Sequence, residues 1–294
     1  MAEFKLKRVL CPVDFSEPSA AALRMAGGVA KAFGAELTVL HAQILEAPVY
    51  FTVAQTQALK AQLRRSTQAA HAHLADFVVK YLPADLTRSI EVVEDDPVVA
   101  ILRTAKNWKA GLVVMGTHGR TGLTKVRLGS VMESVLRQTG APVLTVGPGI
   151  KPVASLGVIR RILCPVNYSS LAEIAFEHAR TLAEKTGAQL TLLNIAEETP
   201  SGQGLDEAQR VLCDWVAPAV RERCSVKEVA RQGNSAEQIV AEAKSSGADL
   251  VVIGAQSRGS LGTMLFGSTT EVVIRRAPCP VFTVVRRERS PRHN

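Results

Sequence analysis

The sequence predicts an α/β fold made of two tandem, doubly wound domains, each a five-stranded parallel sheet with helices on both faces. The first observation is alternation: short apolar runs of strand length are separated by longer segments of helical pattern along the whole chain. The second is repetition. Residues 8–14, RVLCPVD, return as 161–167, RILCPVN, and residues 112–116, LVVMG, return as 250–254, LVVIG. Duplication of one domain explains both observations.

The two copies differ in length at one place. Equivalent residues are 153 positions apart at the start of the copies (8 and 161) and 138 apart later (112 and 250), so the second copy is 15 residues shorter. We predict domains at 1–147 and 156–287, joined by a Gly- and Pro-containing link and followed by a basic tail, 288–294. The surplus in the first copy is either a longer helix or a loop that covers a site.

Local signals place the elements of the first copy. Ser16 and Pro18 start a helix that ends before Gly34, and Asp96-Pro97 starts another. The predicted strands are 8–13, 36–41, 89–93, 112–115 and 141–146, and the predicted helices are 16–33, 53–81, 96–109 and 130–139. The second copy matches them, with a shorter second helix at 205–223.

Composition bounds the class of protein. The chain has 294 residues, 47% of them hydrophobic, and no apolar run approaches the roughly 20 residues that span a bilayer. Its start shows no signal peptide, so we predict a cytoplasmic protein without a membrane partner. The net charge of +8 permits weak attraction to polyanions, but only 4% of residues are aromatic, which argues against a specific nucleic-acid surface.

The five cysteines form no metal or disulfide pattern. They include no C-x-x-C pair, and Cys11 and Cys164 lie in apolar, strand-like runs. We therefore expect buried, reduced cysteines and no zinc site.

Residues 113–130 combine a strand, a glycine-rich loop and a helix start. Ser130 and Glu133 have the spacing of a capping box, which predicts a helix beginning at Ser130. Such a layout presents backbone N–H groups and a partial positive charge to a phosphate.

The glycine spacing in this stretch resembles the nucleotide-binding loop of the universal stress protein family. The pattern is Gly116, Gly119, Gly129 and Ser130, and the resemblance extends from about residue 7 to residue 286. It implies Rossmann-like domains of the adenine nucleotide alpha hydrolase type. It also implies ATP as the ligand, with or without Mg²⁺.

Ligands of open α/β sheets bind beyond the carboxyl ends of the strands, where the strand order reverses. We expect Asp14 to accept from a ribose hydroxyl, the backbone near Ala42 to pair with a base, and the glycine loop to hold phosphates. The candidate residues of the first copy are Val13, Asp14, Ala42, Met115, Gly116, Gly119, Arg120, Gly129, Ser130 and Val131, with Lys125 and Arg127 as further countercharges.

The second copy offers a weaker version of the same site. Asn167 stands in place of Asp14, and Ser257 replaces the second loop glycine. An amide pairs with a hydroxyl more weakly than a carboxylate does. The remaining candidates are Ile195, Gly254, Gly267 and Ser268, and this half either binds nucleotide or is a degenerate partner.

Several residues also have purely structural interpretations. Asp14 would shape the turn into the first helix, residues 116–130 would be a plain βα connection, and His118 would be an exposed loop histidine. His41, at a strand end, is expected to be structural, and Ser16 reads as an N-cap.

Three functions remain open. The first is an ATP-binding stress-response or signalling module without efficient catalysis, because no Gly-Lys-Ser/Thr loop or Ser-His-Asp arrangement is present. Its halves would pair through their C-terminal strands, Val143–Val146 and Val281–Val285, leaving open a homodimer of whole chains and an unidentified protein partner. The second is a slow ATPase or a nucleotidyl or phosphoryl transferase that uses Asp95 and Asp96. The third is a nucleotide-free dimeric interaction module.

Overall fold

A single mixed sheet of ten strands runs through both halves of the chain. The structure is a computed structural model that describes residues 5–44, 53–86, 88–118, 128–150, 159–196, 204–255 and 267–285, with only the backbone described at 53–63. The strands are β1 Arg8–Pro12, β2 Glu36–Gln43, β3 Arg88–Glu94, β4 Leu112–Gly116, β5 Val143–Val146, β6 Arg161–Pro165, β7 Gln189–Ala196, β8 Val226–Gln232, β9 Leu250–Ala255 and β10 Val281–Val285.

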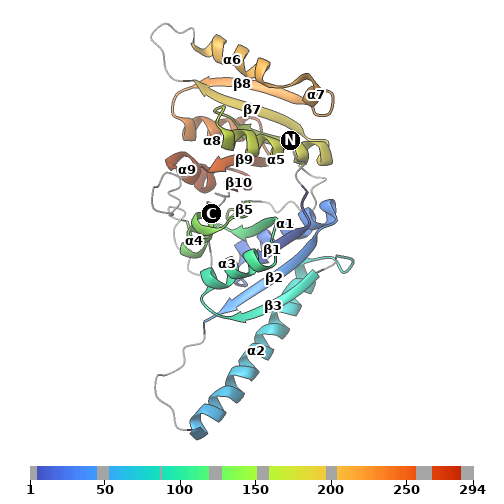
Figure 1. Cartoon of the computed structure of the whole chain (residues 1–294), viewed down its shortest axis with the longest axis vertical. Helices are drawn as coiled ribbons and strands as arrows, with labels where there is room; N and C mark the ends of the chain where they lie inside the picture. The colour runs from blue at the N-terminus through green and yellow to red at the C-terminus, as the bar shows by residue number, and fades with distance from the viewer. Residues whose placement is uncertain are drawn as a thin grey trace, which may run out of the picture.

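The strand order, β3-β2-β1-β4-β5-β10-β9-β6-β7-β8, contains two copies of one parallel arrangement. Within each half every printed pairing is parallel, and the two halves meet where β5 pairs with β10 in the antiparallel sense. The predicted pairing of the C-terminal strands is therefore confirmed. Figure 1 shows the result, an elongated molecule with the first half at one end and the second half at the other.

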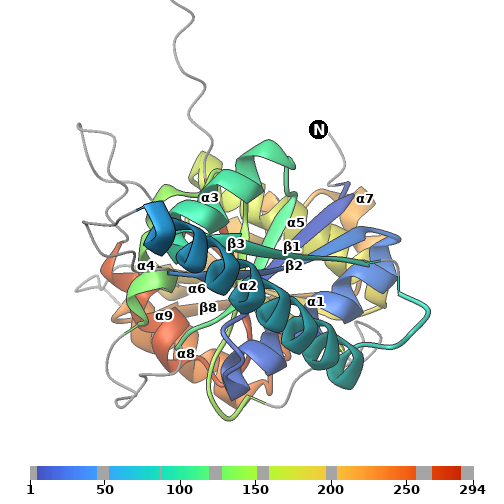
Figure 2. The same cartoon turned by 90° about the horizontal axis from the view of Figure 1, so that it is seen from below.

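Helices cover both faces of the sheet, as the predicted fold class requires. One face carries α1 Glu17–Phe33, α2 Val53–Tyr81, α5 Ser170–Thr186, α6 Gly204–Trp215 and α7 Pro218–Arg221; the other carries α3 Pro97–Asn107, α4 Ser130–Gln138, α8 Ser235–Ser245 and α9 Ser268–Arg276. Figure 2 shows α1 and α3 on opposite sides of the strands of the first half. Each face has its own cluster of buried apolar side chains.

Short-range signals in the sequence account for several helix ends. The Ser16 side chain accepts from the N–H of Ser19 and caps α1, and Asp96 caps α3 in the same way. Gly34 and Gly187 follow α1 and α5 with φ of 61° and 69°, a left-handed conformation that favours glycine.

Two element predictions need correction or refinement. The single helix predicted at 205–223 is wrong: it is divided into α6 and α7, because Pro218 lies in the first turn of α7 and cannot continue a preceding helix. In the first half, α2 is an unbroken helix of 29 residues, against 12 in α6 and 4 in α7, so a longer helix accounts for most of the surplus. Figure 1 shows α2 projecting beyond the sheet.

All five cysteines are unpaired and four of them are buried, including Cys11 and Cys164, whose burial was predicted. Burial raises the pKa of the Cys11 thiol far above its ordinary value and the pKa of the Cys164 thiol to about 12, so both stay protonated. No group of three or more potential metal ligands occurs among the described residues. No helix in the described part of the chain is long and apolar enough to cross a membrane.

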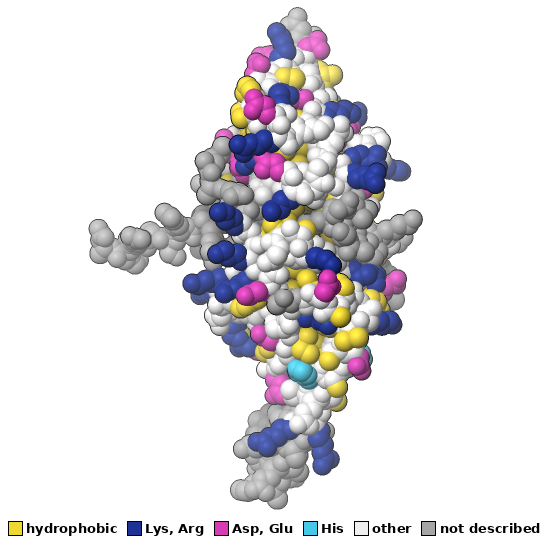
Figure 3. Space-filling view, turned by 90° about the vertical axis from the view of Figure 1, so that its right-hand side faces the viewer, with side chains coloured by type: hydrophobic (Ala, Val, Ile, Leu, Met, Phe, Trp, Pro, Cys, Tyr) yellow, Lys and Arg dark blue, Asp and Glu magenta, His cyan; other side chains and the backbone are white. Residues whose placement is uncertain are grey.

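Charges of both signs are distributed over the surface. On the face drawn in Figure 3, Lys and Arg side chains are interspersed with Asp and Glu. Several basic groups are ion-paired, such as Lys31 with Asp85 at 2.8 Å and Arg103 with Asp95 at 2.7 Å. The described basic side chains on this face are therefore accompanied by acidic ones.

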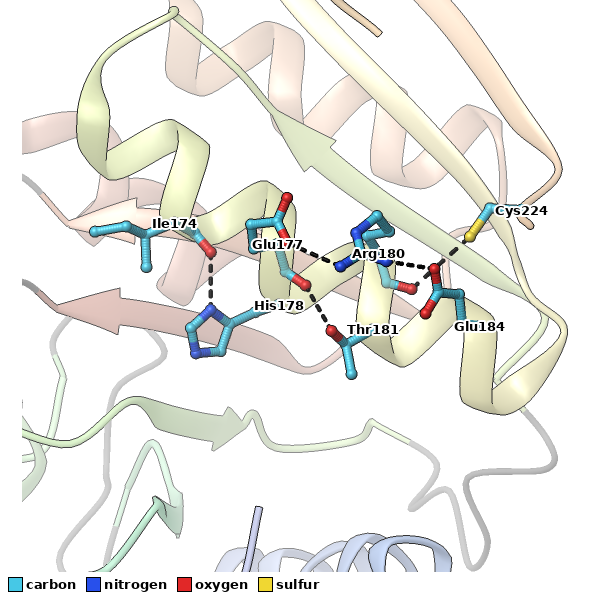
Figure 4. Close-up of polar contacts among 7 residues, drawn as sticks. All are labelled: Ile174, Glu177, His178, Arg180, Thr181, Glu184 and Cys224. Atoms are coloured by element: carbon cyan, nitrogen blue, oxygen red, sulfur yellow. Dashed lines mark hydrogen bonds and ion pairs between the residues drawn. The ribbon is translucent and has the colours of Figure 1, made fainter. Parts of the chain in front are cut away.

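Helix α5 carries a histidine into the region where the halves meet. His178 Nδ1 lies 2.8 Å from the carbonyl oxygen of Ile174 (Figure 4). The ring centroid of His178 lies 5.6 Å from that of Phe282 on β10. Desolvation lowers the pKa of His178 below its ordinary value of 6.5, because burial disfavours the charged form. In the first copy the equivalent position holds Met25, which is fully buried.

This burial makes stability depend on pH. Below about pH 6.5 the unfolded chain binds a proton at His178 before the folded chain does, so the free energy of unfolding should fall as pH falls toward the folded-state pKa. His178→Met, which copies the first half, is expected to reduce that slope. Urea denaturation between pH 7.5 and 5.5 would measure it; an equal slope in both proteins would contradict this expectation.

Candidate functional site

A pocket of about 240 Å³ opens beyond the carboxyl ends of β1 and β4, where the strand order of the first half reverses. Every candidate residue of the first copy that the structure describes lines it. These are Val13, Asp14, Ala42, Met115, Gly116, Gly129, Ser130 and Val131. Gly119 and Arg120, together with Lys125 and Arg127, lie outside the described residues.

Asp14 occupies a tight turn at the mouth of this pocket. Its Oδ1 accepts from the backbone N–H of Ser16 at 3.0 Å and from the Ser16 hydroxyl at 2.5 Å. Phe15 between them has φ of 64°, which is costly for a residue with a side chain. Asp14 therefore shapes the turn into α1, and the same turn fixes its carboxylate at the pocket.

A side chain at the end of β2 holds the backbone beside Asp14. His41 Nδ1 lies 2.9 Å from the carbonyl oxygen of Val13, while the N–H of Val13 donates to the carbonyl of Leu40 at 2.8 Å. The Phe15 ring stacks on His73 of α2 with centroids 4.2 Å apart and lies 4.4 Å from His41. His41 is thus a positioning residue, in agreement with the structural role expected for it.

The two described ends of the glycine loop are joined by backbone hydrogen bonds. The N–H of Thr117 donates to Val146 at 3.0 Å, and the N–H of Gly129 donates to Thr117 at 2.9 Å. The amide of Gly129 is therefore engaged. The N–H groups available to an anion at this end of the loop belong to the residues after it, at the start of α4.

The helix start predicted at Ser130 is confirmed, but the capping box from which it was predicted is not formed. Gly129 is the N-cap of α4, with no side-chain cap hydrogen bond, and Ser130 is the first helical residue. Glu133 pairs instead with Arg137, with Nη2 and Oε1 2.6 Å apart. The helix start has no side-chain cap hydrogen bond, and the exposed Ser130 lines the pocket, so the partial positive charge of the helix start lies at the pocket.

His118 is not the exposed loop residue that the sequence predicted. It is half-buried and lines the pocket, and its Nδ1 lies 2.9 Å from the Thr117 hydroxyl. Its Nε2 is buried and has no hydrogen-bond partner within the described structure.

Helix α3 contributes residues that sequence reasoning missed. Pro97 and Ile101 line the pocket, as does Met132 of α4. Only the apolar spacing of Pro97 and Ile101 in the sequence hinted that one face of this helix is buried. The nearby carboxylates do not line the pocket: Asp96 caps α3, and Asp95 pairs with Arg103.

The second half contains the equivalent pocket, with a volume of about 510 Å³. All five candidates of this half, Asn167, Ile195, Gly254, Gly267 and Ser268, line it. Asn167 Oδ1 accepts from the Ser169 N–H at 3.3 Å and from its hydroxyl at 2.7 Å, and Tyr168 has φ of 58°. The second half thus forms the same turn as the first, with the Asn167 amide in place of the Asp14 carboxylate.

Fold and pocket together define a tandem Rossmann-like protein with a pocket at the switch point of each half. Comparison with known proteins agrees. The model of the universal stress protein family matches residues 5–147 and 159–285, so the chain belongs to that family.

Its similarity to individual family members extends over both halves. A universal stress protein of Mycolicibacterium smegmatis is 27% identical over 292 residues, covering 94% of this chain and 96% of the relative. One from Mycobacterium tuberculosis H37Rv is 29% identical over 203 residues, covering 65% of this chain and 67% of the relative. The crystal structure of a universal stress protein from Archaeoglobus fulgidus superposes with a TM-score of 0.72 at 26% identity, covering 96% of this chain and all of that one (100%).

Proposed function

We propose that this universal stress protein binds ATP in its first half and acts as a nucleotide-dependent stress-response module without efficient catalysis. The observation that carries the proposal is the composition of the first pocket. An oriented carboxylate at Asp14 and a helix start without a side-chain cap at Ser130 line one cavity at the strand-order switch point. The carboxylate suits ribose hydroxyls, and the helix start suits phosphate.

Apolar residues between these two ends support a nucleoside. Ala42, Ile101 and Met115 line the pocket and offer a surface of the kind that packs against a base. Basic residues in the neighbouring sequence, Arg120 and Lys125, supply charge of the sign that phosphates require.

The enzymatic alternative has less support. Asp96 Oδ1 accepts from the backbone N–H groups of Val98 and Val99, and Asp95 accepts from the backbone N–H of Asp96 and pairs with Arg103. Both carboxylates are engaged at the start of α3, which is the structural role weighed for them in the sequence. Binding with little or no hydrolysis is therefore the function we propose.

The substitution Asp14→Asn tests the proposal without breaking the turn, because Asn167 forms the same turn in the second half. ATP affinity should fall about five- to tenfold, since a neutral amide replaces a charged acceptor. Isothermal titration of the full chain with ATP, with and without Mg²⁺, measures this.

The matched control is Asn167→Asp, which makes the reverse change in the other half and should leave the affinity of the first pocket unaltered. If the unsubstituted protein gave no heat with ATP, either with or without Mg²⁺, nucleotide binding would be refuted. Equal ATP affinity in the Asp14→Asn variant would refute the role of this carboxylate.

A further inference from the structure

The two pockets share a backbone frame but differ in the chemistry of their linings. Asp14 and His118 put ionisable groups on the first pocket. No charged or ionisable side chain occurs among the described residues that line the second. Its polar members are hydroxyls and one amide: Asn167, Ser169, Ser235, Ser268, Thr269 and Thr270.

Three of these hydroxyls replace apolar side chains of the first copy. Ser235 stands where the first copy has Pro97, Thr269 where it has Val131, and Thr270 where it has Met132. All six residues line their respective pockets. Compared with the first pocket, the second therefore has neutral hydrogen-bonding groups at several positions where the first has ionisable or apolar ones.

The sequence of the second copy also carries fewer basic residues after its fourth strand. The positions equivalent to Lys125 and Arg127 hold Thr263 and Leu265, whereas Arg258 stands at the position of Arg120. Arg231, near the end of β8, is ion-paired with Glu242 of α8, with Nε and Oε2 3.0 Å apart. A triphosphate in this pocket would therefore have fewer opposite charges to replace its lost hydration than one in the first pocket, which is less favourable.

The loss of Asp14's charge at Asn167 does not reverse this conclusion. It removes a repulsion at the end of the pocket that suits a ribose, but it adds no attraction for phosphate. The helix start at α9 remains, with Gly267 as N-cap, but it resembles that of α4 and so does not distinguish the two pockets.

The apolar side of the second pocket indicates an amphipathic ligand. Ile195, Ile239 and Ile253 line it, and Ile195 replaces the smaller Ala42. These side chains can pack on a flat ring, while the hydroxyls of Thr269 and Thr270 can pair with ligand hydroxyls. We propose that the second pocket binds an uncharged nucleoside, whereas a charged nucleotide is the ligand of the first.

This inference goes beyond the proposed function, because it concerns the other pocket and does not require ATP binding in the first. The probe is adenosine, titrated calorimetrically into the full chain in the presence of saturating ATP. One adenosine per chain is expected to bind. Absence of adenosine binding without ATP, or its loss when ATP is added, would overturn the proposal.

Variants locate the site. Thr269→Val with Thr270→Val removes two hydroxyls with little change of shape, and should weaken adenosine binding about tenfold or more. Thr283→Val is the matched control, because this buried residue of β10 does not line the pocket and its hydroxyl has no partner within the described structure. Wild-type adenosine affinity in the double variant would overturn the proposal.

The experiments can refute ATP binding in the first pocket and nucleoside binding in the second pocket independently of each other. Adenosine binding that depends on Thr269 and Thr270 in a protein that gives no heat with ATP would sustain this inference and refute nucleotide binding in the first pocket. Calorimetry with free ribose and with adenine tests the ligand class. Binding of either as tightly as adenosine would show that the pocket does not recognise the whole nucleoside.

Discussion

Phe282→Ala is expected to lower the free energy of unfolding by about 3–5 kcal/mol, the usual cost of removing a large, fully buried aromatic side chain. Phe282 is 2% exposed and lies on β10 opposite Leu144 of β5, in the antiparallel pairing that joins the two halves. It lines a small apolar cavity together with Met25 of α1 and Leu182 of α5. The side chain therefore packs against both halves at once.

Denaturation in urea, followed by circular dichroism and by tryptophan fluorescence, would measure this loss. Because the contacts of Phe282 come from both halves, the whole transition should shift to lower urea concentration. Phe282→Leu, which keeps an apolar side chain in place, should cost less. A change confined to the second half, or a loss of less than about 1 kcal/mol, would show that the halves are not stabilised through this residue.

The joining of the halves was predictable because it depends on strands that the sequence marks clearly. Val143–Val146 and Val281–Val285 are apolar, repeated and last in their copies, and an edge strand of this kind needs a partner. Helix ends were predictable for a similar reason: Ser16 and Gly34 act through contacts with residues a few positions away.

The first residue of α4, Ser130, was predicted correctly, but its capping was not. Ser130 and Glu133 have the correct spacing for a capping box, but the hydrogen bond from Gly129 to Thr117 spans the glycine loop and places the N-cap one residue earlier. A contact between residues that are distant in sequence decided between two locally acceptable arrangements.

The pocket residues also fall into two groups: those that a rule based on sequence order could locate, and those that only packing brings to the pocket. Asp14, Ala42 and Gly116 follow strand ends, so the rule for open α/β sheets located them. Ile101 was missed because only the packing of α3 over the sheet brings it to the pocket. The burial of His118 likewise depends on how the chain continues after β4, which short-range patterns do not specify.

The second large effect is expected from Gly116→Ala. A Cβ at Gly116 would lie 2.9 Å from Cβ of Pro18 and 3.0 Å from its carbonyl carbon, so the first turn of α1 must move away from β4. Overpacking of this kind costs about 1–3 kcal/mol. It also displaces the turn that holds Asp14, since Ser16 is both its hydrogen-bond donor and the N-cap of α1.

ATP affinity of the first pocket should therefore fall more than tenfold in Gly116→Ala, beyond the loss expected for Asp14→Asn. Gly254→Ala is the matched control: its Cβ would lie 2.8 Å from Cγ of Leu171 at the start of α5, so its cost in stability is of the same kind but falls on the other pocket. Urea denaturation and ATP titration of both variants separate the two effects. If Gly254→Ala weakened ATP binding as much as Gly116→Ala, general destabilisation rather than the geometry beside Asp14 would explain the loss.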